Sequence, residues 1–286
     1  MFSTALRDDG LESLELVDGD AKSKLVIAPS RGGMATRWHA LGRDVFYLDE
    51  STLHDETKNV RGGNPVLFPQ PGKLDGDLYE RDGRRGSMKQ HGFARNLAWK
   101  VTRRGTEGAA SAVLRLTSNA VTQASFPWDF NVEYTYILRG PVVRIEQRFE
   151  NTGNDPMPFG AGFHPYFHVK QADKKAARVG TTATRAFDNV TKQTVALAID
   201  LATKETDLHL QDHGAKPCTL EWASGSIAVR GSEEFTHWVV WSVDGKDFVC
   251  IEPWTCPGNA LNTGDRLLIL PPGETRTLWV EYEVRR

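Results

Sequence analysis

The sequence predicts an all-β protein built from antiparallel strands, arranged as a sandwich or a barrel. The first observation is a hydrophobic period of two, clearest in Val143–Glu150 and Leu278–Val284, which is typical of half-buried antiparallel strands. The second is turn chemistry between such segments, for example Asp18-Gly19 and Asp244-Gly245. The third is the lack of helical periodicity, with only a short turn expected near Gln171–Ala177. Many strands, frequent turns and no alternation with helices indicate a sandwich or barrel.

Each expected strand is rich in β-branched and aromatic residues and ends near Gly, Pro, Asn or Asp. In chain order, we expect strands at Leu14–Val17, Leu25–Ala28, Met34–His39, Val45–Leu48, Val113–Thr117, Val132–Leu138, Val143–Glu150, Cys218–Trp222, Ile227–Arg230, Trp238–Ser242, Phe248–Glu252 and Leu278–Val284. No linker or internal repeat is visible, so a single domain spanning 1–286 is predicted. The segment Asp49–Gln90 is rich in Gly, Pro and charge, and long irregular segments in compact domains are usually functional.

Bulk composition narrows the classes of partner. The 286 residues carry 35 basic and 37 acidic side chains, a net charge of -2, so neither nucleic acid nor a membrane surface is expected as the partner. The three cysteines, Cys218, Cys250 and Cys256, have no C-x-x-C spacing, which disfavours a disulfide framework or a zinc knuckle. Reduced thiols and the lack of a leader or an apolar span favour a cytoplasmic protein. The oligomeric state is left open.

Two matching dipeptides, His164-Pro165 and Glu252-Pro253, are the strongest candidates for catalysis. Proline restricts the preceding residue to extended backbone, so an imidazole and a carboxylate are each held on a stiff segment. Aromatic residues surround both. Such an arrangement suits general acid–base chemistry on a small polar substrate, and aromatic faces beside polar groups suit a sugar ring.

Three further segments offer binding groups. Arg61 precedes two glycines, and its planar fork suits a carboxylate or a phosphate, although a solvated arginine in a surface turn is the plainer interpretation. If the segment after Gln90 is a strand, His91, Phe93 and Arg95 share one face; the alternative is a core strand with an incidental histidine. Asp207 precedes a strand and is either a turn residue or an acceptor for sugar hydroxyls.

No metal or other cofactor is expected. His164 and His168 are four positions apart on an extended segment, which separates them by roughly 13 Å, too far for a shared ion. Cys250 and Cys256 flank Glu252 but have no obvious local base, so a nucleophilic cysteine is disfavoured.

Four motifs in this order resemble the aldose 1-epimerase (mutarotase) superfamily, and most of all its hexose-6-phosphate mutarotase-related branch. They are Arg61-Gly-Gly-x-Pro-x-x-Phe-Pro, Gln90-His-Gly-Phe-Ala-Arg, His164-Pro-Tyr-Phe and Ile251-Glu-Pro-Trp. The resemblance spans about residues 20–285 and implies an antiparallel β-supersandwich of large sheets. It also implies interconversion of the α and β anomers of an aldose, without a cofactor.

The resemblance implies a role for each candidate residue. Glu252 matches the general base that removes the C1 hydroxyl proton, and His164 the general acid at the ring oxygen. His91 matches a second histidine near that oxygen, and Asp207 an acidic residue that binds sugar hydroxyls. A further pair, Arg61 and Arg95, matches arginines that hold a phosphate.

Departures from the sugar-phosphate pattern leave the substrate open. The segments Gln70–Leu74 and Cys256–Asn259 differ from the best-marked members, so both a hexose 6-phosphate and a free aldohexose remain candidates. A non-catalytic sugar-binding or sugar-sensing protein on the same fold is the alternative, because fold does not fix function. A third interpretation, a glycoside hydrolase or lyase, would use paired carboxylates such as Asp207 and Glu252, but the His164-Pro-Tyr-Phe motif argues against it.

Overall fold

The computed structural model describes residues 1–8 and 10–286, and it is mostly antiparallel β-sheet, with 51% strand and 8% helix. Every pairing between its named strands is antiparallel, as in the hairpin of β11 (Phe130–Arg139) and β12 (Val142–Asn151). The prediction of an all-β antiparallel fold is therefore confirmed. Within these ranges, no helix has the length and apolar character that a membrane span requires.

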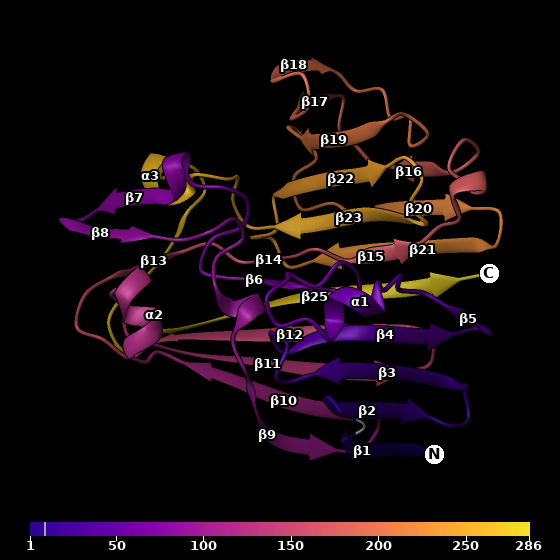
Figure 1. Ribbon diagram of the computed structural model, residues 1–286, viewed down its shortest axis with the longest axis horizontal. Coiled ribbons are helices and arrows are strands. Elements are labelled where there is room, and N and C mark those ends of the chain that lie inside the picture. Colours follow the sequence, from indigo (N-terminus) through magenta and orange to yellow (C-terminus); the bar gives the residue numbers. More distant parts are fainter. Residues whose placement is uncertain (9) are drawn as a thin grey trace.

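Two large sheets and a smaller one make up most of the fold (Figure 1). The N-terminal sheet consists of β1 (Phe2–Asp8), β2 (Glu12–Asp18), β3 (Ser23–Ala28), β4 (Met34–Ala40) and β5 (Arg43–Asp44), in that order. The long sheet runs β16 (Arg178–Gly180), β20 (Cys218–Trp222), β21 (Gly225–Gly231), β25 (Thr275–Arg285), β12, β11, β10 (Ala110–Thr117), β9 (Lys100–Gly105).

The other eight-stranded sheet is called here the site sheet. Its order is β18 (Gln193–Ala196), β17 (Arg185–Asp188), β19 (Glu205–Leu210), β22 (His237–Val243), β23 (Phe248–Trp254), β14 (Gly162–Phe163), β6 (Val66–Leu67), and β15 (Tyr166–His168) also pairs with β23. Two small ribbons complete the strands: β7 (Leu78–Arg81) with β8 (Arg84–Ser87), and β13 (Met157–Phe159) with β24 (Leu268–Leu270).

The helices are single short turns. They are α1 (Glu50–Leu53), α2 (Ala120–Ser125) and α3 (Ala260–Thr263), with 3₁₀ turns at Asp75–Asp77, Ala94–Asn96 and Gln171–Asp173. The last of these lies inside the turn expected at Gln171–Ala177. No segment of the described chain supplies a helix long enough to form a layer, so the sheets pack on one another.

The long sheet forms one layer, and the N-terminal sheet and the site sheet pack side by side on its buried face. Contacts join β1 and β2 to β10, and β2 and β3 to β11, while β23 contacts β21; Figure 1 shows the N-terminal sheet over β10–β12. The phenol of Tyr136 donates to the carbonyl of Gly33 at 2.7 Å, and the amide of Gly140 donates to Asp18 at 2.8 Å. A continuous aromatic core fills the space between the layers.

Alternation along β11, β12 and β25 produces this core. On β11 every second side chain is fully buried while the residues between are half-buried, as the period of two predicts. Phe68, from β6's neighbourhood, has its ring centroid 5.2 Å from that of Phe130 and 5.6 Å from that of Phe149. Burying a side chain of this size stabilises the fold by about 1.5–3 kcal/mol.

Several local predictions were wrong or incomplete. Val45–Leu48 is not a strand, because Phe46 bridges to Phe167 and Leu48 bridges to Gly62, so no single partner strand runs alongside. The segment around His91 and Arg95 is not a strand either: His91 has φ 70°, and Arg95 lies in a 3₁₀ turn.

Strands without a hydrophobic signal were not predicted from the sequence. They include β1, β9 and β18, whose side chains are mostly exposed at sheet edges. At an edge, the hydrogen-bonded neighbour rather than a buried face stabilises the strand, so the period of two is weak.

Candidate active site

One face of the site sheet carries Asp207 and Glu252 in two neighbouring cross-strand rows. Asp207 pairs with Trp241, and Trp241 pairs with Cys250. In the next row, His209 pairs with Val239 and Val239 with Glu252. Because side chains alternate along a strand, residues two apart share a face. The face thus carries a carboxylate on β19 and another on β23.

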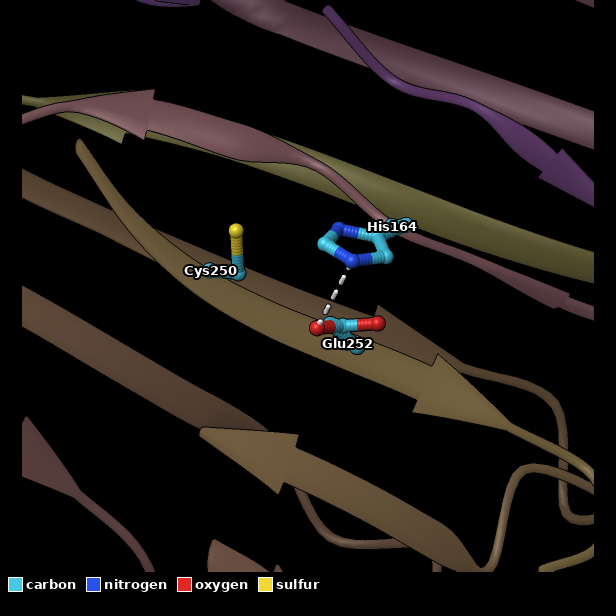
Figure 2. Close-up of side chains that lie close together, drawn as sticks. All are labelled: His164, Cys250 and Glu252. Atoms are coloured by element: carbon cyan, nitrogen blue, oxygen red, sulfur yellow. Dashed lines mark ion pairs between the residues drawn. The ribbon is translucent and has the colours of Figure 1, made fainter. Parts of the chain in front are cut away.

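His164 and Glu252 form the centre of the site. His164 follows β14, and its Nε2 lies 3.5 Å from Oε1 of Glu252 on β23 (Figure 2). The imidazole stacks on the ring of Tyr166, with centroids 4.7 Å apart and planes 10° apart. Trp254 donates its indole N–H to Oε2 of Glu252 at 3.2 Å. Both side chains are therefore fixed by neighbouring aromatic rings.

Burial controls the charges of this pair. The side chain of Glu252 is only 2% exposed, and its burial, followed by the negative charge of Asp207, raises its pKa well above the ordinary value. Burial and the nearby Arg95 lower the pKa of His164 to about 3. Burial thus disfavours both charged forms, which makes a Glu252 carboxylate a stronger base, and a His164 imidazolium a stronger acid, than in water.

His91 lies edge-on to His164, with ring centroids 5.5 Å apart. Its Nδ1 accepts a hydrogen bond from the backbone amide of Gly72 at 3.0 Å. Burial, and then the positive charge that His164 can carry, lower the pKa of His91 well below the ordinary value, so the ring is neutral. With Nδ1 accepting, the single proton is on Nε2. His91 is thus held as a hydrogen-bond donor beside the pair.

Asp207 accepts two donors. Nδ2 of Asn189 donates to Oδ2 at 2.7 Å, and Nε2 of His209 lies 3.4 Å from Oδ1. Burial raises the pKa of Asp207, but the hydrogen bonds from His209 and Asn189 outweigh it, and the net pKa is below the ordinary value. Asp207 is therefore an ionised acceptor at neutral pH.

Arg61 and Arg95 reach the same cavity from two loops. Asn96 donates to Asn59 at 2.9 Å, which joins the loop of one arginine to the loop of the other. Arg95 donates from Nη2 to the carbonyl of Gln90 at 2.7 Å. Burial lowers the pKa of Arg95 to about 10, and the charge of Arg61 adds to this effect. Two guanidinium groups close enough to repel each other favour an anion between them.

All six residues that the sequence pointed to line one cavity of about 1170 Å³: Arg61, His91, Arg95, His164, Asp207 and Glu252. The sequence did not single out several others on the same walls, chiefly Asn189, Lys192, His209, His237, Trp241 and Arg266. An alternation signal was present for His209, His237 and Trp241, which share the site face of their strands. Without the strand register, nothing in the sequence links them to Asp207.

Three possible metal donors also meet here. Figure 2 shows Cys250 and Glu252 extending from one strand toward His164, and their donor atoms all lie within 4.8 Å of one another. Burial raises the pKa of the Cys250 thiol well above its ordinary value, so this site has no preformed thiolate, the form of cysteine that binds metal ions. His168, considered earlier as a partner of His164, is not in this group. The expectation of no metal stays a prediction.

Comparison with known proteins assigns the chain to a family. The family model described as aldose 1-epimerase matches residues 17–283. A protein of Cenchrus ciliaris named "Putative glucose-6-phosphate 1-epimerase" is 26% identical over 241 residues, covering 80% of this chain and 67% of that protein. The match to the family model extends over nearly all strands of the three main sheets, so this chain belongs to the aldose 1-epimerase family.

Solved structures agree on the fold. The Slr1438 protein of Synechocystis sp. PCC 6803 is 35% identical with a TM-score of 0.94, covering 100% of this chain and 99% of that one. A galactose mutarotase-like protein of Clostridium acetobutylicum, 16% identical, has a TM-score of 0.85 over 100% of this chain and 98% of that one. The predicted galactose mutarotase-like β-supersandwich is confirmed.

Proposed function

We propose that this protein is an aldose 1-epimerase that interconverts the α and β anomers of an aldohexose or a hexose 6-phosphate. The observation that carries the proposal is the pair of His164 and Glu252, 3.5 Å apart and buried at the wall of a cavity large enough for a sugar. Membership of the aldose 1-epimerase family supports an acid–base reaction at the anomeric carbon. A protein that only binds sugar has no need of two such groups in contact.

The reaction needs one ionisable proton shared by the two residues, so that one acts as the base while the other acts as the acid. Glu252, as base, removes the proton of the C1 hydroxyl, and His164, as acid, delivers a proton to the ring oxygen. The C1–O5 bond breaks, and an open-chain aldehyde forms. Rotation about C1–C2 turns the other carbonyl face toward the hydroxyl, which recloses the ring as the reverse transfers restore both residues. Each positioned transfer contributes on the order of 10²–10⁴-fold.

The binding residues hold the sugar around this pair. His91, with its proton on Nε2, donates toward the ring oxygen region, and ionised Asp207 accepts from sugar hydroxyls. Trp254, whose ring centroid is 5.5 Å from that of His91, offers an apolar face. These contacts orient C1 and the ring oxygen between base and acid, which is the main condition for efficient proton transfer.

The phosphate of a hexose 6-phosphate is assigned to Arg61 and Arg95. Their mutual repulsion is relieved by a dianion, and a guanidinium fork binds phosphate oxygens in pairs. The name of the Cenchrus ciliaris relative supports the same substrate class.

Saturation-transfer NMR between the α and β anomers tests this function. We expect the protein to accelerate exchange for glucose 6-phosphate more than for free glucose or galactose. Acceleration for free sugars alone would retain His164 and Glu252 in their roles but remove the phosphate assignment. If no aldose exchanges faster with the protein than without it, the catalytic proposal is wrong and the sugar-binding alternative replaces it.

A further inference from the structure

A hydrogen-bonded chain of side chains runs from Arg266 to Asp207 along the wall of the cavity. Nη2 of Arg266 lies 3.3 Å from Nδ1 of His237, and Nε2 of His237 lies 2.8 Å from Nδ1 of His209. Nε2 of His209 then faces Oδ1 of Asp207 at 3.4 Å. His209 and Asp207 are on β19, and His237 is on the neighbouring β22. The pairing of β19 with β22 therefore brings His209 and His237 together.

Arginine fixes the direction of every bond in this chain. A guanidinium has donors only, so Nδ1 of His237 must accept, and its proton is on Nε2. That proton is donated to Nδ1 of His209, which places the proton of His209 on Nε2, toward Asp207. Only one pair of neutral tautomers satisfies all the contacts.

A second, shorter arm fixes the other oxygen of Asp207 in the same way. Nζ of Lys192 donates to Oδ1 of Asn189 at 2.6 Å, so the amide group of Asn189 must point its Nδ2 toward Oδ2 of Asp207. Both carboxylate oxygens thus face donors whose orientation is set by a cation, directly by Lys192 on one arm and through His237 by Arg266 on the other. The carboxylate keeps its remaining lone pairs for the cavity that it lines.

Packing holds the two imidazoles in place. His237 is 2% exposed, and its ring stacks on that of Trp254 with centroids 5.6 Å apart. His209 contacts the edge of the same indole, at 5.5 Å between centroids. Trp254 in turn donates to Glu252. The two imidazoles therefore pack on Trp254, which also holds Glu252, the residue that we propose as the base.

We propose that His209 and His237, oriented by Arg266, are positioning residues that hold Asp207 ionised and aimed as a pure acceptor for two sugar hydroxyls. This inference rests on the proposed function, which supplies the sugar. It predicts that the site selects substrates with hydroxyl donors opposite Asp207. Loss of this hydrogen-bonded chain of side chains should weaken sugar binding equally in the ground state and the transition state, which raises KM and leaves kcat nearly unchanged.

Paired substitutions at position 237 separate positioning from mere packing. Glutamine can accept from Arg266 and donate to His209, whereas leucine can do neither. For His237→Leu we expect KM to rise roughly tenfold, as expected for a weakened hydrogen bond to a charged group, with kcat within about threefold. His237→Gln should retain most of the affinity. Equal KM values for the two variants would overturn the proposal.

The matched control is His213→Leu. His213 is also 2% exposed and bonds to Thr181 and to the carbonyl of Lys216, but it does not line the cavity. We expect its KM to stay at the wild-type value; a rise like that of His237→Leu would mean that KM reports general destabilisation. If His237→Leu does not fold, Arg266→Ala replaces it, and an unchanged KM there overturns the proposal.

Nitrogen-15 NMR of the imidazole rings tests the chain without any assay of activity. Wild-type His209 and His237 should both appear as neutral rings with the proton on Nε2. A proton on Nδ1 of either ring would overturn the proposal. If the wild type shows no anomer exchange, the proposed function fails, and the ring spectrum still decides whether the chain exists.

Discussion

At the scale of single residues, the proposed binding of a phosphate by Arg61 and Arg95 can be tested by substitution. Arg61→Ala removes one of two guanidinium groups that face the same space, so binding of glucose 6-phosphate should weaken by roughly ten- to a hundredfold, as for loss of a charge-assisted bidentate contact. Free glucose should lose little. Saturation kinetics on both sugars measure the difference. Equal losses would remove Arg61 from phosphate binding, and Arg185→Ala, outside the cavity, is the control.

We also expect that removal of metal ions has no effect on the rate. In the proposed mechanism His164 and Glu252 suffice for the reaction, so dialysis against a chelator should leave the anomer exchange rate unchanged. The adjacent Cys250 makes this test necessary, since a soft ion could reach all three donors. A rate that falls on dialysis and returns with added zinc would show that the ion takes part.

At the scale of elements, a glycine holds the loop that carries His91 and Arg95. Gly92 has φ 69°, and a Cβ there would meet the carbonyl oxygen of Phe68 at 2.3 Å. Gly108 has nearly the same φ, 70°, with nothing within 4 Å. Replacing either by alanine costs about 1 kcal/mol in the left-handed conformation.

Only Gly92→Ala adds a backbone clash, so we expect it to lose roughly 2–4 kcal/mol more than Gly108→Ala and to weaken sugar binding. Urea unfolding of both variants measures the difference in the free energy of unfolding. Equal losses would show that the loop moves aside freely and does not fix His91.

Elements with a buried face could be predicted from the sequence, and edge elements could not. β11, β12 and β25 carry their alternation in the residues themselves, so each was found within a few positions. β1 and β9 are held by hydrogen bonds to a neighbour, which leave no hydrophobic pattern. The bridge partners of Phe46 and Leu48 lie far along the chain, and a local pattern does not contain that information.

The site followed the same division. Five of the six candidate residues lie in one of the four motifs, Asp207 being the exception, and all six line one cavity. His209 and His237 acquire their function only through the pairing of β19 with β22, and His91 lies in a turn with positive φ rather than on the strand expected. Residues that belong to a short sequence motif could thus be predicted. Residues that are brought together only by strand pairing could be identified only from the structure.

At the scale of the whole molecule, buried histidines predict acid sensitivity. Burial lowers the pKa of His91, His164 and His237, while the unfolded chain binds their protons near pH 6.5. The stabilising contribution of these neutral histidines is therefore fully present above pH 6.5, and the free energy of unfolding falls as the pH drops below that value. Between pH 7.5 and 5.5 each such histidine costs about 1.4 kcal/mol. Glu252, with its raised pKa, acts in the opposite direction.

Urea unfolding at the two pH values tests this prediction. The free energy of unfolding should be lower at pH 5.5, and His91→Gln should reduce that drop by about 1.4 kcal/mol. An unchanged drop would mean that His91 takes up a proton in the folded state.

We also propose that the chain folds as one domain, because one core cluster connects strands of all three main sheets; a single unfolding transition is then expected.

We propose above all that His164 and Glu252 together move one proton on and off a sugar. The most direct test is the anomer exchange rate of glucose 6-phosphate in the wild type and in Glu252→Gln, with a thermal melt to confirm folding. Glutamine keeps the shape and can still accept from Trp254, but it cannot take a proton. We predict that the folded variant loses at least about a hundredfold in kcat. A folded variant with the wild-type rate would contradict the account.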